Sequence, residues 1–236
     1  MPGQPSEISN ATAAEIREVN CPGLGIEDED IRVLEKFTNL VTLDLTANQL
    51  TQFSFDLPKL QKLVIADNQL TVLDVGGLPS LTWVEASNNQ LGSISGLAEF
   101  QPNVLDLSHN QFTEFDLAIL QDLEFVDLSH NKLTAIWDDQ NPSLSSLEAL
   151  QSLDLSNNSL TTIGSLEDIA YTYTGNGDAA QTEQGSLFSL FLACNPTFQC
   201  STLGLDEDNH ALQTSSCAEQ SAGEKWVMRE YPSCLP

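Results

Sequence analysis

The sequence predicts an α/β solenoid, a fold in which short parallel strands stack in chain order and are joined by turns and irregular segments. Three observations predict it. An eleven-residue pattern of leucines recurs seven times, the first five copies are 20 or 21 residues apart, and Asn stands in the ninth place of every copy. Such a period is typical of stacked repeats. One copy cannot bury its own apolar face, whereas stacked copies share a continuous core.

The seven copies assign a position in the fold to each residue type. They begin at Leu40, Leu60, Leu81, Pro102, Leu123, Leu150 and Leu187. Because side chains alternate along a strand, the fourth and sixth places point into the core and the third, fifth and seventh places point outward. The ninth-place Asn turns the chain out of the strand, and its amide can bond unpaired backbone groups of the turn. The Asn column is therefore predicted to be structural.

The pattern LxxLxLxxNxL resembles the leucine-rich repeat family over residues 38–198. This resemblance implies a curved right-handed superhelix with a short parallel β-sheet on its concave face and a mostly irregular convex side. Residues 1–37 are expected to form an N-terminal cap, and 199–236 a cysteine-containing C-terminal cap like those of extracellular members. Within the first cap, acids followed by spaced apolar residues predict a helix of about three turns over 26–37.

The charge balance excludes several classes of partner. The chain has 8 Lys and Arg against 34 Asp and Glu, a formal net charge of −26. Nucleic acids and anionic membranes are recognised through clustered basic residues, so neither is an expected partner. The longest apolar run, 187–194, is less than half of a membrane span. The polar start of the chain contains no visible signal peptide.

The cysteines favour an oxidising compartment. Of the five, four lie in a tail where the regular spacing has ended, namely Cys194, Cys200, Cys217 and Cys234. Disulfides are the preferred interpretation over free thiols, and the spacing makes zinc improbable. The fifth, Cys21, is left unexplained. Glycosylation sequons begin at Asn10 and Asn157 and permit a secreted history. We therefore expect an extracellular or cell-surface protein, with the cytoplasm as the alternative.

The stretch DLSHN at 127–131 places an Asp, a Ser and a His together, as in a catalytic triad. The same five letters recur at 106–110. A triad needs one nucleophile held against one base, whereas a motif copied along a sheet gives columns of like residues. We expect no catalysis, metal or cofactor. The neighbouring His109 and His130 could bind a metal or respond to pH, but ordinary turn residues are the favoured interpretation.

The concave sheet face is the candidate binding surface. Trp83 and Phe125 stand in outward places, where large apolar groups have no core to enter. Fifth-place acids in adjacent strands would lie ~4.8 Å apart and repel by about 1 kcal/mol even in water, which a cationic partner would relieve. The candidate residues are Asp44, Lys62, Trp83, Glu85, Val104, Asp106, Phe125, Asp127 and Asp154, with His109, His130, Tyr171 and Tyr173 as secondary candidates.

Together these features predict a non-catalytic recognition module, secreted or part of a receptor ectodomain, that binds a basic protein or peptide. Aromatic side chains would supply affinity, and acids would steer association. Two alternatives remain open, an intracellular scaffold and an inhibitor of a secreted hydrolase. The fold alone does not choose among them.

Overall fold

The repeats form short parallel strands, each covering the third to fifth places of its copy. In the computed structural model the chain divides into two units, Met1–Gln101 and Pro102–Pro236. The structure describes residues 10–96, 102–115, 123–134, 149–161, 189–191 and 195. The predicted fold class, a solenoid of stacked parallel strands, is confirmed.

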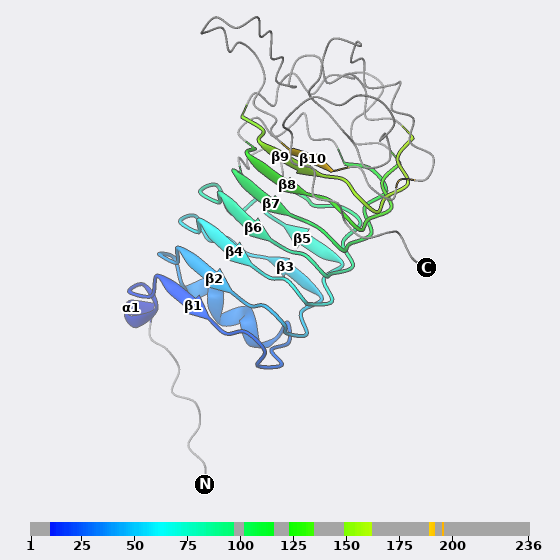
Figure 1. The fold of residues 1–236 in the computed structure, drawn as a ribbon. Coiled ribbons are helices and arrows are strands. Elements are labelled where there is room, and N and C mark those ends of the chain that lie inside the picture. The colour runs from blue at the N-terminus through cyan, green and yellow to red at the C-terminus, as the bar shows by residue number, and fades with distance from the viewer. Residues whose placement is uncertain are drawn as a thin grey trace, which may run out of the picture. The chain divides into compact units, whose positions relative to one another are not determined.

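The first unit contains two parallel sheets. The larger one holds, in this order, β1 (Glu18–Asn20), β2 (Thr42–Asp44), β4 (Lys62–Val64) and β6 (Trp83–Glu85). The smaller one pairs β3 (Gln52–Ser54) with β5 (Val72–Asp74). Figure 1 shows these two rows side by side. Residues with the same place in successive repeats lie opposite each other, so the sequence columns are also columns in space.

In the second unit the structure describes one row of parallel strands. Its strands are β7 (Val104–Asp106), β8 (Phe125–Asp127), β9 (Ser152–Asp154) and β10 (Ser189–Phe191). They pair in parallel in chain order, again in register (Figure 1).

The inward places build the core. Leu43 and Leu45, in the fourth and sixth places of the first repeat, have relative exposures of 0% and 2%, and the corresponding residues of the five repeats that begin between Leu60 and Leu150 are buried as well. Burying one such side chain stabilises the fold by ~1.5–3 kcal/mol. Phe53, three residues after the eleventh place, is also fully buried and packs against Phe55 with ring centroids 5.0 Å apart.

The ninth-place asparagines form the predicted structural ladder. Asn68 is typical, because its Oδ1 accepts the Leu50 N–H while its Nδ2 donates to carbonyls of its own turn and of the preceding repeat. All seven are buried: Asn48, Asn68, Asn89, Asn110, Asn131, Asn158 and Asn195. Within each unit the amide thus links a turn to the turn before it, which explains why the repeats keep an asparagine there.

The eighth place has a left-handed backbone in every repeat where it is described. Its φ lies between 53° and 57° at Ala47, Asp67, Asn88, His109, His130 and Asn157. Asn, Asp and His tolerate this conformation better than other non-glycine residues. The two histidines therefore occupy positions for which the backbone already selects their residue type.

The predicted helix over 26–37 is wrong in extent and type. The chain forms a 3₁₀ helix, η1 (Asp30–Lys36), preceded in the same unit by the short α1 (Asn10–Ala13). Residues ahead of η1 are held by the neighbouring repeat, since the Ile26 N–H bonds Asn48 Oδ1. In addition, Asp28 Oδ1 accepts the N–H of Thr51. The Ile26 carbonyl, which would accept the Asp30 N–H in an α-helix, instead accepts the N–H of Gln49 from the neighbouring repeat, and this contact keeps the segment before Asp30 out of a helix.

Strand β1 extends the sheet ahead of the first predicted copy. It follows from a shortened repeat in which Ile16, Val19 and Cys21 stand in the first, fourth and sixth places. Cys21 is a free, half-buried thiol in a place that a buried apolar residue fills in the later repeats. Its carbonyl accepts a bond from Asn48 Nδ2, the first step of the ladder.

Several sequence predictions lie outside the described residues. They concern the C-terminal cap over 199–236, the four cysteines of the tail, and the secondary candidates Tyr171 and Tyr173. These remain predictions.

Candidate functional site

The candidate surface, called the outward face below, consists of the third- and fifth-place side chains of the large sheet in each unit. Trp83 and Phe125 are its large apolar groups, with relative exposures of 39% and 44%. They lie in β6 of the first unit and β8 of the second. Val104 is half-buried, as are Asp44, Lys62, Glu85, Asp106, Asp127 and Asp154. Among the residues whose side chains the structure describes, each unit therefore presents one exposed aromatic ring on this face, Trp83 beside Lys62 and Glu85, and Phe125 beside Val104 and Asp127.

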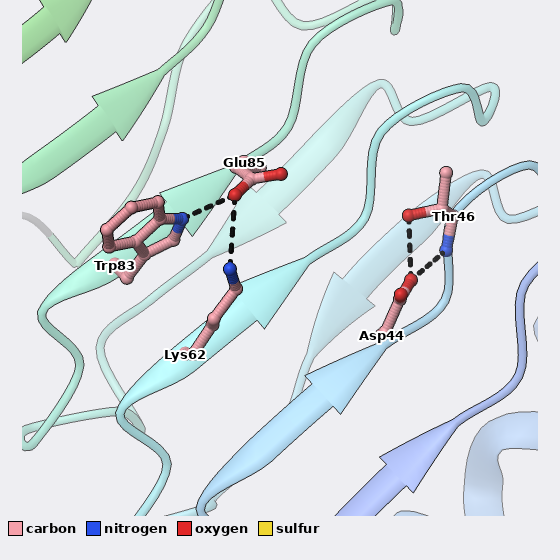
Figure 2. Close-up of polar contacts among 5 residues, drawn as sticks. All are labelled: Asp44, Thr46, Lys62, Trp83 and Glu85. Atoms are coloured by element: carbon pink, nitrogen blue, oxygen red, sulfur yellow. Dashed lines mark hydrogen bonds and ion pairs between the residues drawn. The ribbon is translucent and has the colours of Figure 1, made fainter.

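Trp83, Glu85 and Lys62 form one bonded cluster in the first unit. The Trp83 indole Nε1–H donates to Glu85 Oε1 over 2.6 Å. Lys62 Nζ lies 3.3 Å from the same carboxylate oxygen and 4.4 Å from the centroid of the Trp83 ring. Figure 2 shows the two polar contacts converging on Glu85. One carboxylate thus orients the indole and holds an ammonium beside its π face.

The strand register creates this cluster. β4 and β6 pair in parallel with Lys62 opposite Trp83, and Glu85 follows two residues after Trp83 on the same face. Lys62 is the only basic residue in the ten strands that the structure describes. Two adjacent third-place residues and one fifth-place acid therefore suffice to bring a cation, an aromatic ring and an anion together.

The fifth-place aspartates have a different role from Glu85, because each bonds the turn that follows its strand. Asp44 Oδ1 accepts both the N–H and the hydroxyl of Thr46, as Figure 2 shows. The other three aspartates each accept the N–H of the residue two positions on, through the pairs Asp106–Ser108, Asp127–Ser129 and Asp154–Ser156. Such bonds are typical of Asx turns. Part of the acid column is therefore explained by turn structure alone.

The acids of the second unit also influence one another. Asp106, Asp127 and Asp154 lie opposite each other in β7, β8 and β9. Burial raises the pKa of Asp127, the negative charges of Asp154 and Asp106 raise it further, and hydrogen bonds from Ser129 oppose the rise. The repulsion expected between neighbouring carboxylates is thus present at the central one.

His109 and His130 stack on each other in the turns of the second unit. Their ring centroids are 4.0 Å apart and the planes differ by 10°. Burial lowers the pKa of His130, and the charge of a protonated His109 lowers it further, while Asp154 opposes both. No group of three potential metal ligands occurs within the described ranges.

The DLSHN residues at 127–131 make turn contacts. Asp127 bonds the Ser129 backbone, the Ser129 side chain is buried at 6% exposure, and the His130 ring stacks on His109. Asp127 and Ser129 therefore bond to each other in the turn, and His130 belongs to the ring stack.

Sequence reasoning missed two residues of the outward face. β1 places Glu18 opposite Thr42 and Asn20 opposite Asp44, and both side chains are exposed. The shortened copy that begins at Ile16 contained the signal, but its ninth place holds Leu24 in place of Asn.

Comparison with known proteins gives the same repeat pattern. Residues 38–91 match a family model described as "Leucine rich repeat", and residues 102–123 and 149–169 match a second model of that description. Lumican from Gallus gallus is 35% identical over 125 residues, covering 50% of this chain and 36% of lumican, and lumican from Coturnix japonica matches equally. The match thus spans about a third of the length of these curated relatives.

Solved structures share the fold at low identity. Internalin C2 from Listeria monocytogenes has a TM-score of 0.64 at 21% identity, covering 88% of this chain and 84% of that one. Internalin InlF from the same species gives 0.57 at 20% identity, covering 81% and 51%, and the leucine-rich repeat domain of APL1B gives 0.54 at 22%, covering 75% and 54%. In the part of the chain that the structure describes, no helix is long and apolar enough to cross a bilayer.

Proposed function

Since the chain is a leucine-rich repeat protein, a family of protein-interaction modules, we propose that it is a non-catalytic recognition protein whose outward face binds a basic protein or peptide. The observation that carries this proposal is the exposure of Trp83 and Phe125 on strands whose other outward residues are polar or charged. Exposed aromatic groups next to charges are characteristic of binding hot spots.

Charge supports a basic partner. A net charge of −26 attracts cations at long range and repels other acidic proteins. On the outward face, Asp106, Asp127 and Asp154 repel one another, and a bound cation would relieve this repulsion. We expect the acids to set the association rate and salt dependence, and the aromatic rings to set the dissociation rate.

Affinity capture with matched variants tests the proposal. Trp83→Ala and Phe125→Ala should each weaken capture of a partner by more than about 1 kcal/mol, whereas Val72→Ala should not. Val72 is a suitable control because it is 49% exposed but belongs to β5 of the smaller sheet. A partner that binds both aromatic variants as tightly as wild type would rule out this face.

We also propose that the protein is secreted or displayed at the cell surface. The cysteine-rich tail and the two sequons support this compartment, and Cys21 is free. If the four tail cysteines form disulfides, thiol titration of the denatured, unreduced protein from its native source should find one free thiol. Five free thiols would instead favour the intracellular scaffold.

A further inference from the structure

Lys62 occupies the position at which a cation of the proposed partner would contact Trp83. Its Nζ lies 4.4 Å from the indole centroid and 3.3 Å from Glu85 Oε1. An ammonium over an indole face, next to a carboxylate, is the arrangement by which proteins bind cationic side chains. The chain thus places one of its own cations in a site with the composition of a receptor for cations (Figure 2).

The cluster is organised but remains open to solvent. The hydrogen bond from Trp83 Nε1 to Glu85 fixes the plane of the ring. The Lys62 and Glu85 side chains keep 40% and 33% of their surfaces exposed, and Trp83 keeps 39%. Exposed ion pairs and cation–π contacts are weak, so an incoming group can displace the ammonium at small cost. Displacement would leave the indole and the carboxylate oriented and available.

We propose that Trp83 and Glu85 form the binding site for an arginine side chain of the partner, and that Lys62 is an internal competitor which this arginine displaces. The inference rests on the proposed function, because it requires a basic partner segment. Arginine suits the site better than lysine. Its planar guanidinium stacks on an indole face and bonds a carboxylate with two parallel N–H groups, whereas a lysine would only replace the ammonium already present.

If Lys62 competes with the arginine, removing the charge of Lys62 should increase the affinity for arginine. Lys62→Met keeps an unbranched side chain of similar length and removes the charge, so it removes the competitor. Arginine binding should then tighten by roughly two- to five-fold, the range expected for loss of one exposed cation–π contact. If Lys62 instead bound an acidic group of the partner, the same substitution would weaken binding.

The probe is N-acetyl-argininamide, titrated at about 0.15 M salt to limit general attraction to the acidic protein. The readout is the NMR signal of the Trp83 indole N–H, assigned by its loss in Trp83→Phe. Lys59→Met is the matched control, because it removes one exposed positive charge from the same unit; Lys59 Nζ bonds Asn39 and takes no part in the cluster. N-acetyl-glutaminamide and N-acetyl-lysinamide serve as neutral and ammonium probes.

The expected result is tighter argininamide binding in Lys62→Met than in either wild type or Lys59→Met. The glutaminamide and lysinamide probes should bind each of these proteins more weakly than argininamide does. Glu85→Gln should weaken binding several-fold. Equal affinities in Lys62→Met and Lys59→Met, or no preference for argininamide, would overturn the proposal. Lys62→Gln gives a second test if the methionine variant does not fold.

The outcomes separate this inference from the proposed function. One outcome is that Trp83→Ala no longer captures a partner while Lys62→Met leaves the affinity for argininamide unchanged. This result would support the docking face and reject the role of Lys62 as a competitor. Argininamide binding strengthened by Lys62→Met, without any partner that depends on Trp83 or Phe125, would support the arginine site and reject the protein-docking face.

Discussion

Replacing Asn68 with Ala tests the ladder that joins the repeats. Asn68 is 9% exposed, and its Oδ1 accepts the Leu50 N–H at 3.1 Å. Its Nδ2 lies 3.0 to 3.1 Å from three carbonyl oxygens, those of Leu45, Ile65 and Ala66. Because an amide nitrogen carries two hydrogens, the three carbonyls share two donors. The side chain therefore makes about three full hydrogen bonds. Its partners in the preceding repeat are the Leu50 N–H and the Leu45 carbonyl.

The expected loss follows from these contacts. Losing three buried hydrogen bonds at ~1 kcal/mol each costs about 3 kcal/mol. The Leu50 N–H, left without its acceptor, adds the cost of an unsatisfied buried donor, ~1–3 kcal/mol. Water that enters the space left by the amide would recover part of this cost. We therefore expect Asn68→Ala to lower the free energy of unfolding by about 3–5 kcal/mol.

Urea unfolding followed by far-UV circular dichroism measures this loss. Gln69→Ala is the matched control, since Gln69 is the adjacent residue and is exposed; it should change stability by less than ~0.5 kcal/mol. Amide hydrogen exchange gives a local measurement, because the Leu50 N–H should lose protection in the Asn68 variant. If Asn68→Ala unfolds at the same urea concentration as Gln69→Ala, or if the Leu50 amide stays protected, the ladder does not stabilise the stack.

Three further predictions follow from the same geometry. Ala47→Gly should stabilise the protein by about 0.5–1 kcal/mol in urea unfolding, because Ala47 is exposed with φ at 57°, where an alanine is strained. Gly77→Ala should destabilise it by about 1–3 kcal/mol, since the added Cβ would meet Phe55 O at 2.3 Å, whereas Gly92→Ala meets nothing within 4 Å and should have little effect. Asp127→Asn keeps an acceptor for the Ser129 N–H and removes a carboxylate whose folded-state pKa is raised, so it should increase the free energy of unfolding at pH 7. This gain should vanish below about pH 4, because Asp127 of the wild type is then protonated in both the folded and the unfolded state.

The repeat period was enough to predict the strands and the core. A side chain in the fourth place of one copy has only one environment available once copies stack, so Leu43, Leu63 and Val84 are all buried as expected. The Asn ladder was predictable for the same reason, since an amide in the ninth place faces unpaired turn groups in every copy. Both the buried fourth-place residues and the Asn ladder follow from the strand register, which can be read from the repeat spacing.

Other features depend on interactions that periodicity does not encode. In the segment before Asp30, the Ile26 carbonyl accepts the N–H of Gln49, which lies one repeat further along the chain, in place of the Asp30 N–H that an α-helix would supply. The column of outward residues predicts Lys62 beside Trp83, but periodicity does not fix the side-chain rotamers that bring both residues to Glu85. The turn role of the aspartates had a visible signal, since each fifth-place Asp is followed two residues later by Ser or Thr.

The distinction between Glu85 and the aspartates separates two functions of negative charge on the outward face. Asp44, Asp106, Asp127 and Asp154 each use Oδ1 in a turn, so their charge adds to the long-range field while the carboxylate stays bonded within the protein. Glu85 has no such bond among those described and instead orients Trp83. Charge at a distance accelerates encounter, whereas desolvated contacts slow dissociation. Asp127→Asn should therefore mainly lower the association rate constant and its salt dependence, while Glu85→Gln should mainly raise the dissociation rate constant. Equal effects of the two substitutions on dissociation would show that the turn-bound acids contact the partner directly.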